Sequence, residues 1–425
     1  MDTAGKANLG EMKILLISYY FPPCGGAPVQ RWLRLLPYLT QKGHKVTVIC
    51  SKDGDYPFID ERLLKLVPPS VKIIRVRALG MAKIWNMLSG SKSRMPYGSI
   101  PQKSSLIAQL LIWLRLNLII PDLRVLWNAA AKKAALSELS KIPYDLMIST
   151  GPPHSSHLIA ISIAQSLRIR WFADFRDPMS KIHYLRLHPP SRFAMRKLER
   201  MEKEIVSSAD QCLVVSSAIS DALPVGKKLV IHNGYEARDF EGIIHTKSPI
   251  MRIKYVGQIT AGQDIRLFAE LLRDLRRDYR LSMIGTQLSE DDQALLHQAC
   301  GDKLRIKSFV PHDQAIKEMV DSDLLLLIIN RLEDNQGILT TKLFEYLASR
   351  SPILCLGSED TAAAAIIKDS GAGQSFDYHE IARAKQWLSE LPKGLRTSGR
   401  IDHYCVARQA DILLDAIDSK IGVDK

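Results

Sequence analysis

Short apolar runs alternate with amphipathic segments along most of the chain. The segments between the runs repeat their apolar residues at helical spacing, which is typical of parallel β-strands joined by helices. In the first half of the chain, strands are predicted at 13–18, 45–50, 71–77, 146–150, 170–174, 211–215 and 229–231. Helices are predicted at 28–41 and 192–208; the second is strongly charged, so we expect one of its faces to be exposed.

The same alternation starts again after a polar link at 241–249. Strands in this second half are predicted at 251–256, 281–284, 304–310, 324–329 and 353–356. A pattern that restarts in a chain of 425 residues predicts two α/β domains and not one large sheet. We therefore expect two Rossmann-like domains, 12–235 and 250–402, facing a cleft, and then a helix and tail at 403–425.

Composition places the chain among ordinary globular proteins, with 46% hydrophobic and 24% charged residues. The six cysteines are scattered without a C-x-x-C pair, and several lie in apolar runs. This pattern favours buried free thiols over disulfides or zinc ligands. The first apolar run, 14–20, is too short for a secretory signal, so we expect a cytoplasmic protein.

The net charge of +13 is unevenly placed, because residues 62–121 contain ten Lys or Arg and no acidic residue. Trp and Leu side chains are interleaved with these basic residues, a combination that suits an anionic membrane surface. The apolar run at 106–120 contains Arg115 and is too short to span a bilayer. We expect peripheral membrane contact through 62–121; the alternative is a core helix with a solvated basic face. No nucleic-acid-binding module accompanies the charge, so nucleic acid is not an expected partner.

The segment 337–354 consists of a polar loop, an amphipathic helix that carries Glu345, and then Pro352 and an apolar strand. Thr340 and Thr341 are good helix caps, and a helix start offers unpaired N–H groups and a positive dipole end to an anion. A carboxylate one turn further on can accept hydrogen bonds from the vicinal hydroxyls of a ribose. The segment therefore fits a nucleotide-sugar site, although a surface helix with a solvated Glu345 fits it as well.

Three loops that follow predicted strands carry further candidate chemistry, because loops at the carboxyl ends of parallel strands build the sites of α/β sheets. Gly25 and Gly26 would let a phosphate or sugar approach the backbone, or they form a tight turn. In the run Gly-Pro-Pro-His-Ser, His154 can hydrogen-bond a hydroxyl, or it has a structural role. The run Ala-Asp-Phe-Arg-Asp-Pro, residues 173–178, offers two carboxylates and an arginine that either contact a substrate or pair with one another.

These motifs resemble those of GT-B glycosyltransferases, specifically the large retaining group often called family 4. Members carry a Glu, seven residues and a second Glu before a helix and a Pro-Ile/Val-Leu strand; Glu345 matches the second Glu and Gly337 stands in place of the first. The loops around Gly25, His154 and Asp174 are also similar to family loops. The resemblance covers about residues 12–400.

The resemblance implies a GT-B fold in which the terminal helix crosses back to the first domain, with the acceptor on the first domain and the donor on the second. It implies these donor-binding residues: Gly25, Gly26, Gly257, Gln258, Val310, Thr340, Thr341, Lys342 and Glu345. Its catalytic-site residues, in contact with the acceptor or the donor sugar, would be His154, Asp174, Arg176 and Asp177.

One departure from the family concerns the diphosphate. The family has an Arg or Lys after the glycine that matches Gly257, and another Lys shortly after; this chain has Gln258 and Gln263. Lys342 and Arg331 are the nearest candidates to replace that positive charge. The resemblance implies a metal-independent GT-B enzyme, so we expect no catalytic metal and no cofactor apart from the nucleotide-sugar co-substrate.

The predicted function is transfer of a sugar from a nucleotide-sugar to a hydroxyl, with retention of configuration. The basic and apolar stretch favours a lipid-linked or surface-polysaccharide acceptor at the inner face of the cell membrane. Two alternatives stay open: a nucleotide-sugar epimerase on the same fold, and a non-catalytic GT-B-like binding or scaffold protein, which the replacements at Gly337 and Gln258 favour.

Overall fold

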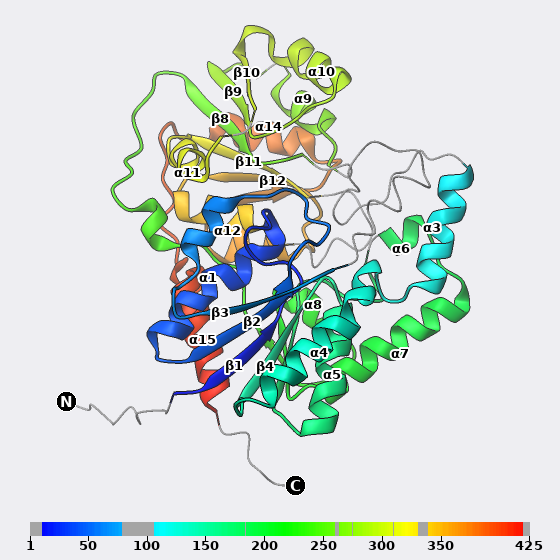
Figure 1. Cartoon of the computed structure of the whole chain (residues 1–425). Coiled ribbons are helices and arrows are strands. Elements are labelled where there is room, and N and C mark those ends of the chain that lie inside the picture. Colours follow the sequence, from blue (N-terminus) through cyan, green and yellow to red (C-terminus); the bar gives the residue numbers. More distant parts are fainter. Residues whose placement is uncertain are drawn as a thin grey trace, which may run out of the picture. The chain divides into compact units, whose positions relative to one another are not determined.

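The structure is a computed structural model that describes residues 11–78, 106–182, 184–259, 263–273, 275–308, 310–329 and 339–419 (Figure 1). Two compact units divide the chain. The first comprises Met1–Ile231 and Ala410–Lys425, and the second comprises His232–Gln409.

The first unit is built on a seven-stranded parallel sheet in the order β3-β2-β1-β4-β5-β6-β7. Its strands are β1 (Lys13–Ile17), β2 (Lys45–Ser51), β3 (Lys72–Val76), β4 (Leu146–Gly151), β5 (Trp171–Phe175), β6 (Gln211–Val214) and β7 (Lys228–Val230). All the predicted runs of this half are strands, within one or two residues. Leu15 of β1 pairs with Thr47 of β2 on one side and with Met147 of β4 on the other. The strand order therefore reverses between β1 and β4, which is where α/β sheets place their sites.

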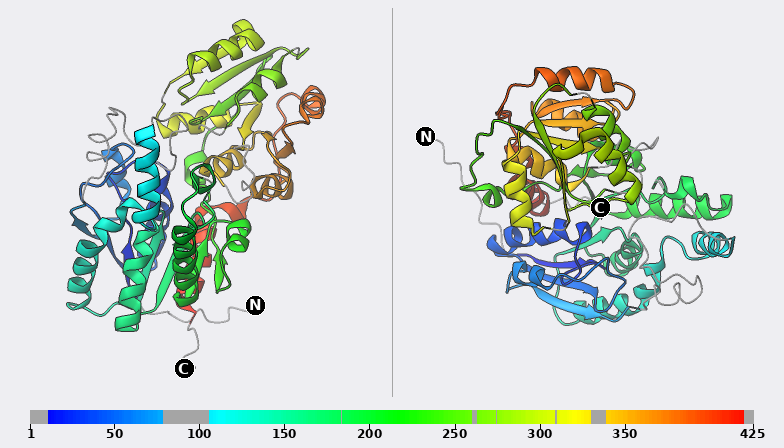
Figure 2. Two further views of the ribbon diagram at one scale, coloured as in Figure 1. Left: turned by 90° about the vertical axis from the view of Figure 1, so that its right-hand side faces the viewer. Right: turned by 90° about the horizontal axis from the view of Figure 1, so that it is seen from above.

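Helices cover this sheet on both faces (Figure 2). They are α1 (Ala27–Gln41), α3 (Leu106–Leu118), α4 (Asn128–Leu139), α5 (Ser155–Leu167), α6 (Tyr184–Leu187), α7 (Arg192–Ser208) and α8 (Ser217–Ala222). In α7 the Ser191 side chain accepts a hydrogen bond from the Ala194 N–H and caps the helix. The buried face of α7 includes Leu198 and Ile205, while its charged face is exposed, as predicted.

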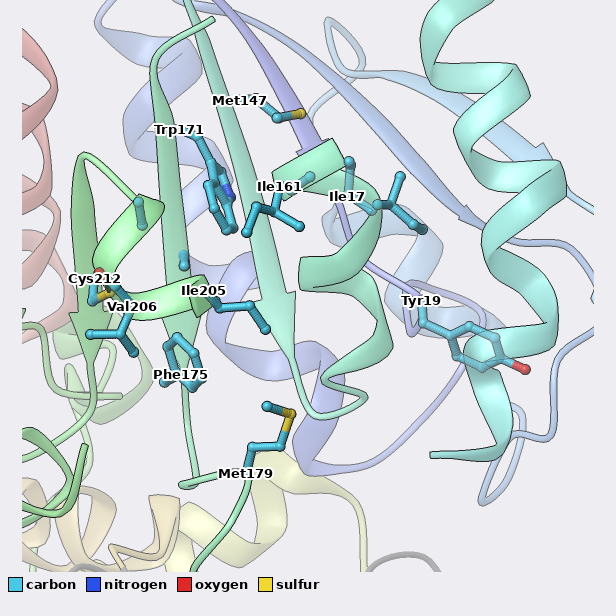
Figure 3. Packing of buried hydrophobic residues seen from close by; sticks show 14 of the residues in the cluster. Ile17, Tyr19, Met147, Ile161, Trp171, Phe175, Met179, Ile205, Val206 and Cys212 are labelled. Atoms are coloured by element: carbon cyan, nitrogen blue, oxygen red, sulfur yellow. Dashed lines mark hydrogen bonds between the residues drawn. The ribbon is translucent and has the colours of Figure 1, made fainter. Parts of the chain in front are cut away.

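The core of the first unit packs the helices against apolar side chains of the central strands. Ile17, Met147, Trp171 and Phe175 lie in this cluster, and each is fully buried (Figure 3). All six cysteines are free and all except Cys405 are buried, which confirms the expectation of buried thiols.

The C-terminal helix α15 (Val406–Asp418) belongs to the first unit from Ala410 onward, which confirms the predicted crossover. Its end is held by the Arg170 guanidinium, which donates to the carbonyls of Ile417 and Ala416 and stacks over Phe172 at 4.8 Å. A cation at this position also complements the negative end of the helix dipole.

The second unit contains a six-stranded parallel sheet in the order β10-β9-β8-β11-β12-β13. Its strands are β8 (Met251–Val256), β9 (Tyr279–Ile284), β10 (Leu304–Lys307), β11 (Leu324–Ile328), β12 (Ile353–Leu356) and β13 (Gly373–Phe376). Its helices are α9 (Arg266–Leu272), α10 (Glu290–Cys300), α11 (His312–Val320), α12 (Thr341–Ser349), α13 (Ala362–Asp369) and α14 (Ile381–Glu390). The strand predicted at 304–310 ends early, at Lys307, and β13 was not predicted.

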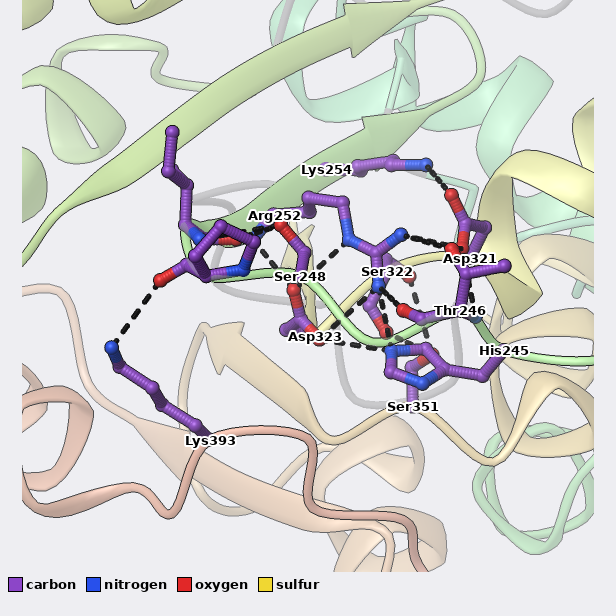
Figure 4. A network of polar contacts seen from close by, with 12 residues as sticks. His245, Thr246, Ser248, Arg252, Lys254, Asp321, Ser322, Asp323, Ser351 and Lys393 are labelled. Carbon is purple, nitrogen blue, oxygen red and sulfur yellow. Dashed lines mark hydrogen bonds and ion pairs between the residues drawn. The ribbon is translucent and has the colours of Figure 1, made fainter.

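A polar network joins the amino ends of β8 and β11 (Figure 4). The Arg252 guanidinium is paired with Asp323 at 3.1 Å and also with Asp321, and His245 Nε2 lies 2.9 Å from the Asp323 carboxylate. Burial would raise the pKa of Asp323, but the hydrogen bonds from Arg252 hold that pKa below its usual value. The network lies at the opposite end of the sheet from the strand-end loops and acts as a structural clamp.

Within the described residues, no helix combines the length and the apolar character that a bilayer crossing requires.

Candidate functional site

In the first unit, Asp174 at the end of β5 is fully buried and holds α1 against the sheet. Its carboxylate accepts hydrogen bonds from Arg31 Nε at 3.0 Å, Trp32 Nε1 at 2.9 Å and Thr150 Oγ1 at 2.7 Å. Arg31 also donates to the carbonyl of Ile231 at 2.7 Å. The ion pair of Asp174 is therefore with Arg31 of α1, and not within its own loop. This geometry favours a role in positioning for Asp174.

Arg176 organises the neighbouring loop after β4. Its Nη2 donates to the carbonyl of Pro152 at 2.7 Å, and its Nε and backbone N–H both donate to the carbonyl of Gly151, at 3.3 and 3.1 Å. Asp177 is partly buried in the turn that follows β5. Arg176 thus fixes the loop from which His154 projects.

His154 is 6% exposed and lies where the β4 loop meets α5, with its ring 5.6 Å from that of Phe175. Neither of its ring nitrogens has a hydrogen-bond partner among the described residues. Burial lowers the pKa of His154 well below its ordinary value, and His157 and Arg176 lower it further. At neutral pH His154 is therefore an uncharged imidazole, which can donate a hydrogen bond to a hydroxyl or accept one from it.

His157 is a second buried histidine of this loop, for which no role was predicted. Its Nδ1 lies 2.8 Å from Ser149 Oγ, which accepts a hydrogen bond from Trp171 Nε1 at 2.9 Å. Burial lowers the pKa of His157 to about 3. Its spacing of three residues from His154 was the available signal, since such residues share a helix face.

The Gly25–Gly26 turn after β1 packs against the Phe58 side chain, which lies between β2 and β3. Gly26 has a φ of 93°, and the Gly25 N–H donates to the carbonyl of Phe58 at 2.9 Å. A Cβ on Gly25 would lie 2.2 Å from the Phe58 ring. The absence of a side chain at Gly25 is therefore required for packing, whatever else the turn binds.

In the second unit, Gly257 at the end of β8 and Lys342 in the first turn of α12 lie in contact. Lys342 Nζ donates to Tyr255 Oη at 2.6 Å and lies 4.0 Å from the centre of the Tyr255 ring. A Cβ on Gly257, whose φ is 123°, would lie 2.6 Å from Lys342 Cε. Gln258 is exposed, and its backbone carbonyl accepts from Tyr255 Oη at 2.9 Å. Lys342 thus lies beside Gly257, the residue after which the family has an Arg or Lys.

The start of helix α12 has a threonine at the N-cap position, but this threonine does not cap the helix. Thr340 is the N-cap residue, but its side chain makes no capping hydrogen bond, and its hydroxyl has no partner among the described residues. Thr341 is the first residue of the helix. Among the described residues, the start of α12 therefore has no side-chain cap.

Glu345 follows one turn later, and its carboxylate lies 3.1 Å from His312 Nε2. The Glu345 side chain is 12% exposed, so it is not the solvated glutamate of the alternative interpretation. His312 is the first residue of α11, and partly buried Val310 stands just before it. Sequence reasoning missed His312, because a single histidine after a proline carries no distinctive signal.

Other predicted residues lie outside the described part of the chain: Gly337, Arg331 and residues 79–105 of the basic stretch. In the parts that are described, no group of three or more His, Cys, Asp or Glu side chains is placed to hold a metal ion.

Comparison with known proteins identifies the fold. No protein-family model and no curated protein sequence matches the chain. Among solved structures, the lipopolysaccharide outer core galactosyltransferase WaaB is similar over 96% of this chain and 100% of its own, with a TM-score of 0.61 and 14% identity. Sucrose-phosphate synthase from Thermosynechococcus elongatus matches over 96% of both chains, with a TM-score of 0.58 and 14% identity.

Anabaena HepE, whose structure was solved in complex with UDP-glucose, matches over 96% of this chain and 95% of its own. Its TM-score is 0.55 and its identity 12%. Together with the two parallel sheets and the crossover helix, these similarities show that the chain has the GT-B fold.

Proposed function

We propose that the protein is a glycosyltransferase that moves a sugar from a nucleotide-sugar donor to a hydroxyl acceptor with retention of configuration. The observation that carries the proposal is the contact between Lys342 and Gly257, one helical turn from Glu345, on a GT-B fold. Lys342 and Glu345 lie on α12, whose start has no side-chain cap among the described residues, at the carboxyl end of the second sheet. These are the groups that a nucleoside diphosphate needs.

In this proposal the donor binds to the second unit. The diphosphate contacts the Lys342 ammonium and the N–H groups at the start of α12, which suit an anion because of their direction and the helix dipole. Glu345, held by His312, accepts hydrogen bonds from the ribose hydroxyls. Gly257 leaves the backbone at the end of β8 open to the phosphates, and Val310 lines the position of the base.

The acceptor and the transferred sugar are assigned to the first unit. Neutral His154 can hydrogen-bond a sugar hydroxyl without adding a charge, while Arg176 and Asp177 shape the loops beside it. The C–O bond between sugar and diphosphate breaks, and the acceptor oxygen forms the new bond on the same face. The departing phosphate oxygen takes the acceptor's proton. The protein's contribution is to position the reactants and to offset the charge that develops on the diphosphate, with Lys342 as the main cation.

Equilibrium binding tests the donor assignment. UDP, GDP and ADP are titrated into the wild-type protein and into Glu345→Gln, with Glu290→Gln, a change at an exposed glutamate of α10, as the matched control. At least one diphosphate should bind, and Glu345→Gln should weaken it about tenfold, since it replaces charged acceptors of ribose hydrogen bonds. The control should leave affinity unchanged. Equal affinity for the wild type and Glu345→Gln would contradict the ribose assignment, and no binding would contradict the donor site.

We further propose that the acceptor is lipid-linked or a surface-polysaccharide precursor and that the first unit contacts the cytoplasmic face of an anionic membrane. Helices α3 and α7 lie side by side (Figures 1 and 2), joined by the Ser191 N–H, which donates to Asn117 Oδ1 at 2.8 Å. Trp113 and Leu118 of α3 and Phe193 of α7 are exposed apolar side chains. Exposed basic residues accompany them on α7: Arg192, Arg196, Lys197 and Arg200. This combination suits an interfacial helix pair.

Liposome flotation tests this contact. The wild-type protein should float with vesicles that contain phosphatidylglycerol at low salt and less so at high salt, because screening weakens the attraction. Replacing Trp113 and Phe193 together by alanine should abolish flotation, whereas Leu167→Ala, an exposed leucine on α5, should not change it. Failure of the wild type to float at low salt would refute membrane contact.

A further inference from the structure

Lys342 carries an amine that is partly buried and has no ion pair among the described residues. Its polar contact is the hydroxyl of Tyr255 at 2.6 Å, and the ring of the same residue lies beneath it at 4.0 Å. A hydroxyl and a ring face do not neutralise an ammonium, so the described residues do not give the amine the counterion that a buried cation normally requires.

The described groups that surround Lys342 do not supply a full negative charge in contact with it. On β8, Tyr255 is a neutral phenol, because burial raises its pKa well above neutral pH. On α12, Tyr346 is also a neutral phenol, and Glu345 directs its carboxylate to His312 of α11. Burial therefore lowers the pKa of Lys342 to about 7, although nearby Glu345 acts in the opposite direction.

The position of the amine is fixed by its neighbours. A side chain at Gly257 would displace Lys342 from this position, since a Cβ there would lie 2.9 Å from Nζ. Tyr255 Oη donates to the carbonyl of Gln258 at 2.9 Å and thereby turns a lone pair toward the amine. The amine is thus held beside the end of β8, close to the start of its own helix, whose Thr340 hydroxyl makes no hydrogen bond among the described residues.

We propose that Lys342 is the phosphate-binding residue of the second unit and that it takes up a proton from solvent when a phosphate-bearing ligand binds. The proton adds to the amine lone pair, no covalent bond is broken, and the resulting ammonium pairs with a phosphate oxygen. The proposal rests on the donor site described above, and it adds that binding at this site is coupled to pH.

The direction in which pH changes the affinity follows from the charged and neutral states of the Lys342 amine. Below pH 7 the free protein already carries the ammonium, so binding takes up no proton and the contribution of Lys342 to affinity does not change with pH. Above pH 7 the Lys342 amine of the unliganded protein is increasingly neutral. A proton from solvent must therefore add to this amine when the phosphate binds. Affinity should then fall by up to about tenfold for each pH unit, until the raised pKa of the bound state is reached.

The test uses isothermal titration of UDP, GDP and ADP into the full-length protein between pH 6 and 9. At pH 8 the titrations are repeated in Tris and in HEPES, whose different ionisation heats report the number of protons exchanged. The wild type should take up about one proton per diphosphate bound at pH 8 and almost none at pH 6. Lys342→Arg, which stays charged throughout, should take up none and show a flat affinity across this range.

Controls separate the titration of Lys342 from other causes of a pH-dependent affinity. The diphosphates themselves are fully ionised above pH 7, and any residual titration of theirs is shared by the wild type and Lys342→Arg. Lys368→Arg on α13 should behave as the wild type. Lys342→Met should bind about 10- to 100-fold more weakly than the wild type at pH 6; circular dichroism checks that it is folded, and Lys342→Arg provides the test if it is not.

Two results would overturn the proposal in distinguishable ways. Diphosphate binding to the wild type without proton uptake, or with the same pH profile as Lys342→Arg, would contradict the coupling and leave the donor site intact. Absence of binding of all three diphosphates at every pH would contradict both the coupling and the proposed function.

Discussion

Replacing Asp174 by alanine is expected to destabilise the first unit by about 3–5 kcal/mol. The carboxylate is fully buried and accepts from Arg31, Trp32 and Thr150, so its removal leaves a buried guanidinium without its counterion and two donors without an acceptor. Urea unfolding followed by tryptophan fluorescence measures the loss. Five of the six tryptophans precede residue 232, so the signal mainly reports the first unit.

Two controls make this prediction specific. Asp60→Ala removes an ion pair whose Arg62 side chain is 63% exposed, and it should cost at most about 1 kcal/mol. The double variant Arg31→Met with Asp174→Leu removes both charges, and it should recover part of the stability that Asp174→Ala loses. If Asp174→Ala unfolded at the same urea concentration as the wild type, the pairing of α1 with β5 would not be the structural tie described above.

Replacing Gly257 by valine is expected to abolish most of the donor affinity of the second unit. The residue has a φ of 123°, and a Cβ would lie 2.6 Å from Lys342 Cε, so valine both strains the backbone and displaces the lysine. We expect diphosphate binding to weaken at least about tenfold, as for loss of one charge-assisted hydrogen bond, with destabilisation of about 1–3 kcal/mol. Titration calorimetry and thermal unfolding measure the two effects.

The matched control for this change is Gly371→Val. Gly371 also has a positive φ, of 58°, but a Cβ there would meet no atom within 4 Å. It therefore also places a valine at a positive φ, and it should leave diphosphate affinity unchanged. Equal loss of affinity in both variants would show that general destabilisation, and not displacement of Lys342, is responsible.

The fold was largely predictable because each strand of a parallel sheet is buried on both faces and is read as an apolar run. The strand β13 was missed for the same reason: of its residues Gly-Gln-Ser-Phe, only Phe376 is buried. The early end of β10 was also not predictable, since Lys307 is followed by Ser308, and Val310 continues the apolar pattern beyond the end of the strand.

The site was predictable where a local motif marks it and not where distant residues meet. Glu345 and Lys342 lie in one recognisable segment, and the structure adds that Lys342 contacts Gly257. By contrast, Asp174 and Arg31 are separated by 143 positions, and no local pattern links an arginine in α1 to a carboxylate in β5. Pairings of this kind depend on strand order, which the apolar pattern does not determine.

The central claim is that the chain transfers sugar from a nucleotide-sugar, and nucleotide release from a panel of nucleotide-sugars tests it most directly. The panel contains UDP-, GDP-, ADP-, CDP- and dTDP-linked sugars, and proton NMR follows the anomeric centre of the released or transferred sugar. We expect release of nucleotide from at least one donor, with retained configuration and with a large reduction in Lys342→Met. No release from any donor, or release that is the same in Lys342→Met, would contradict it.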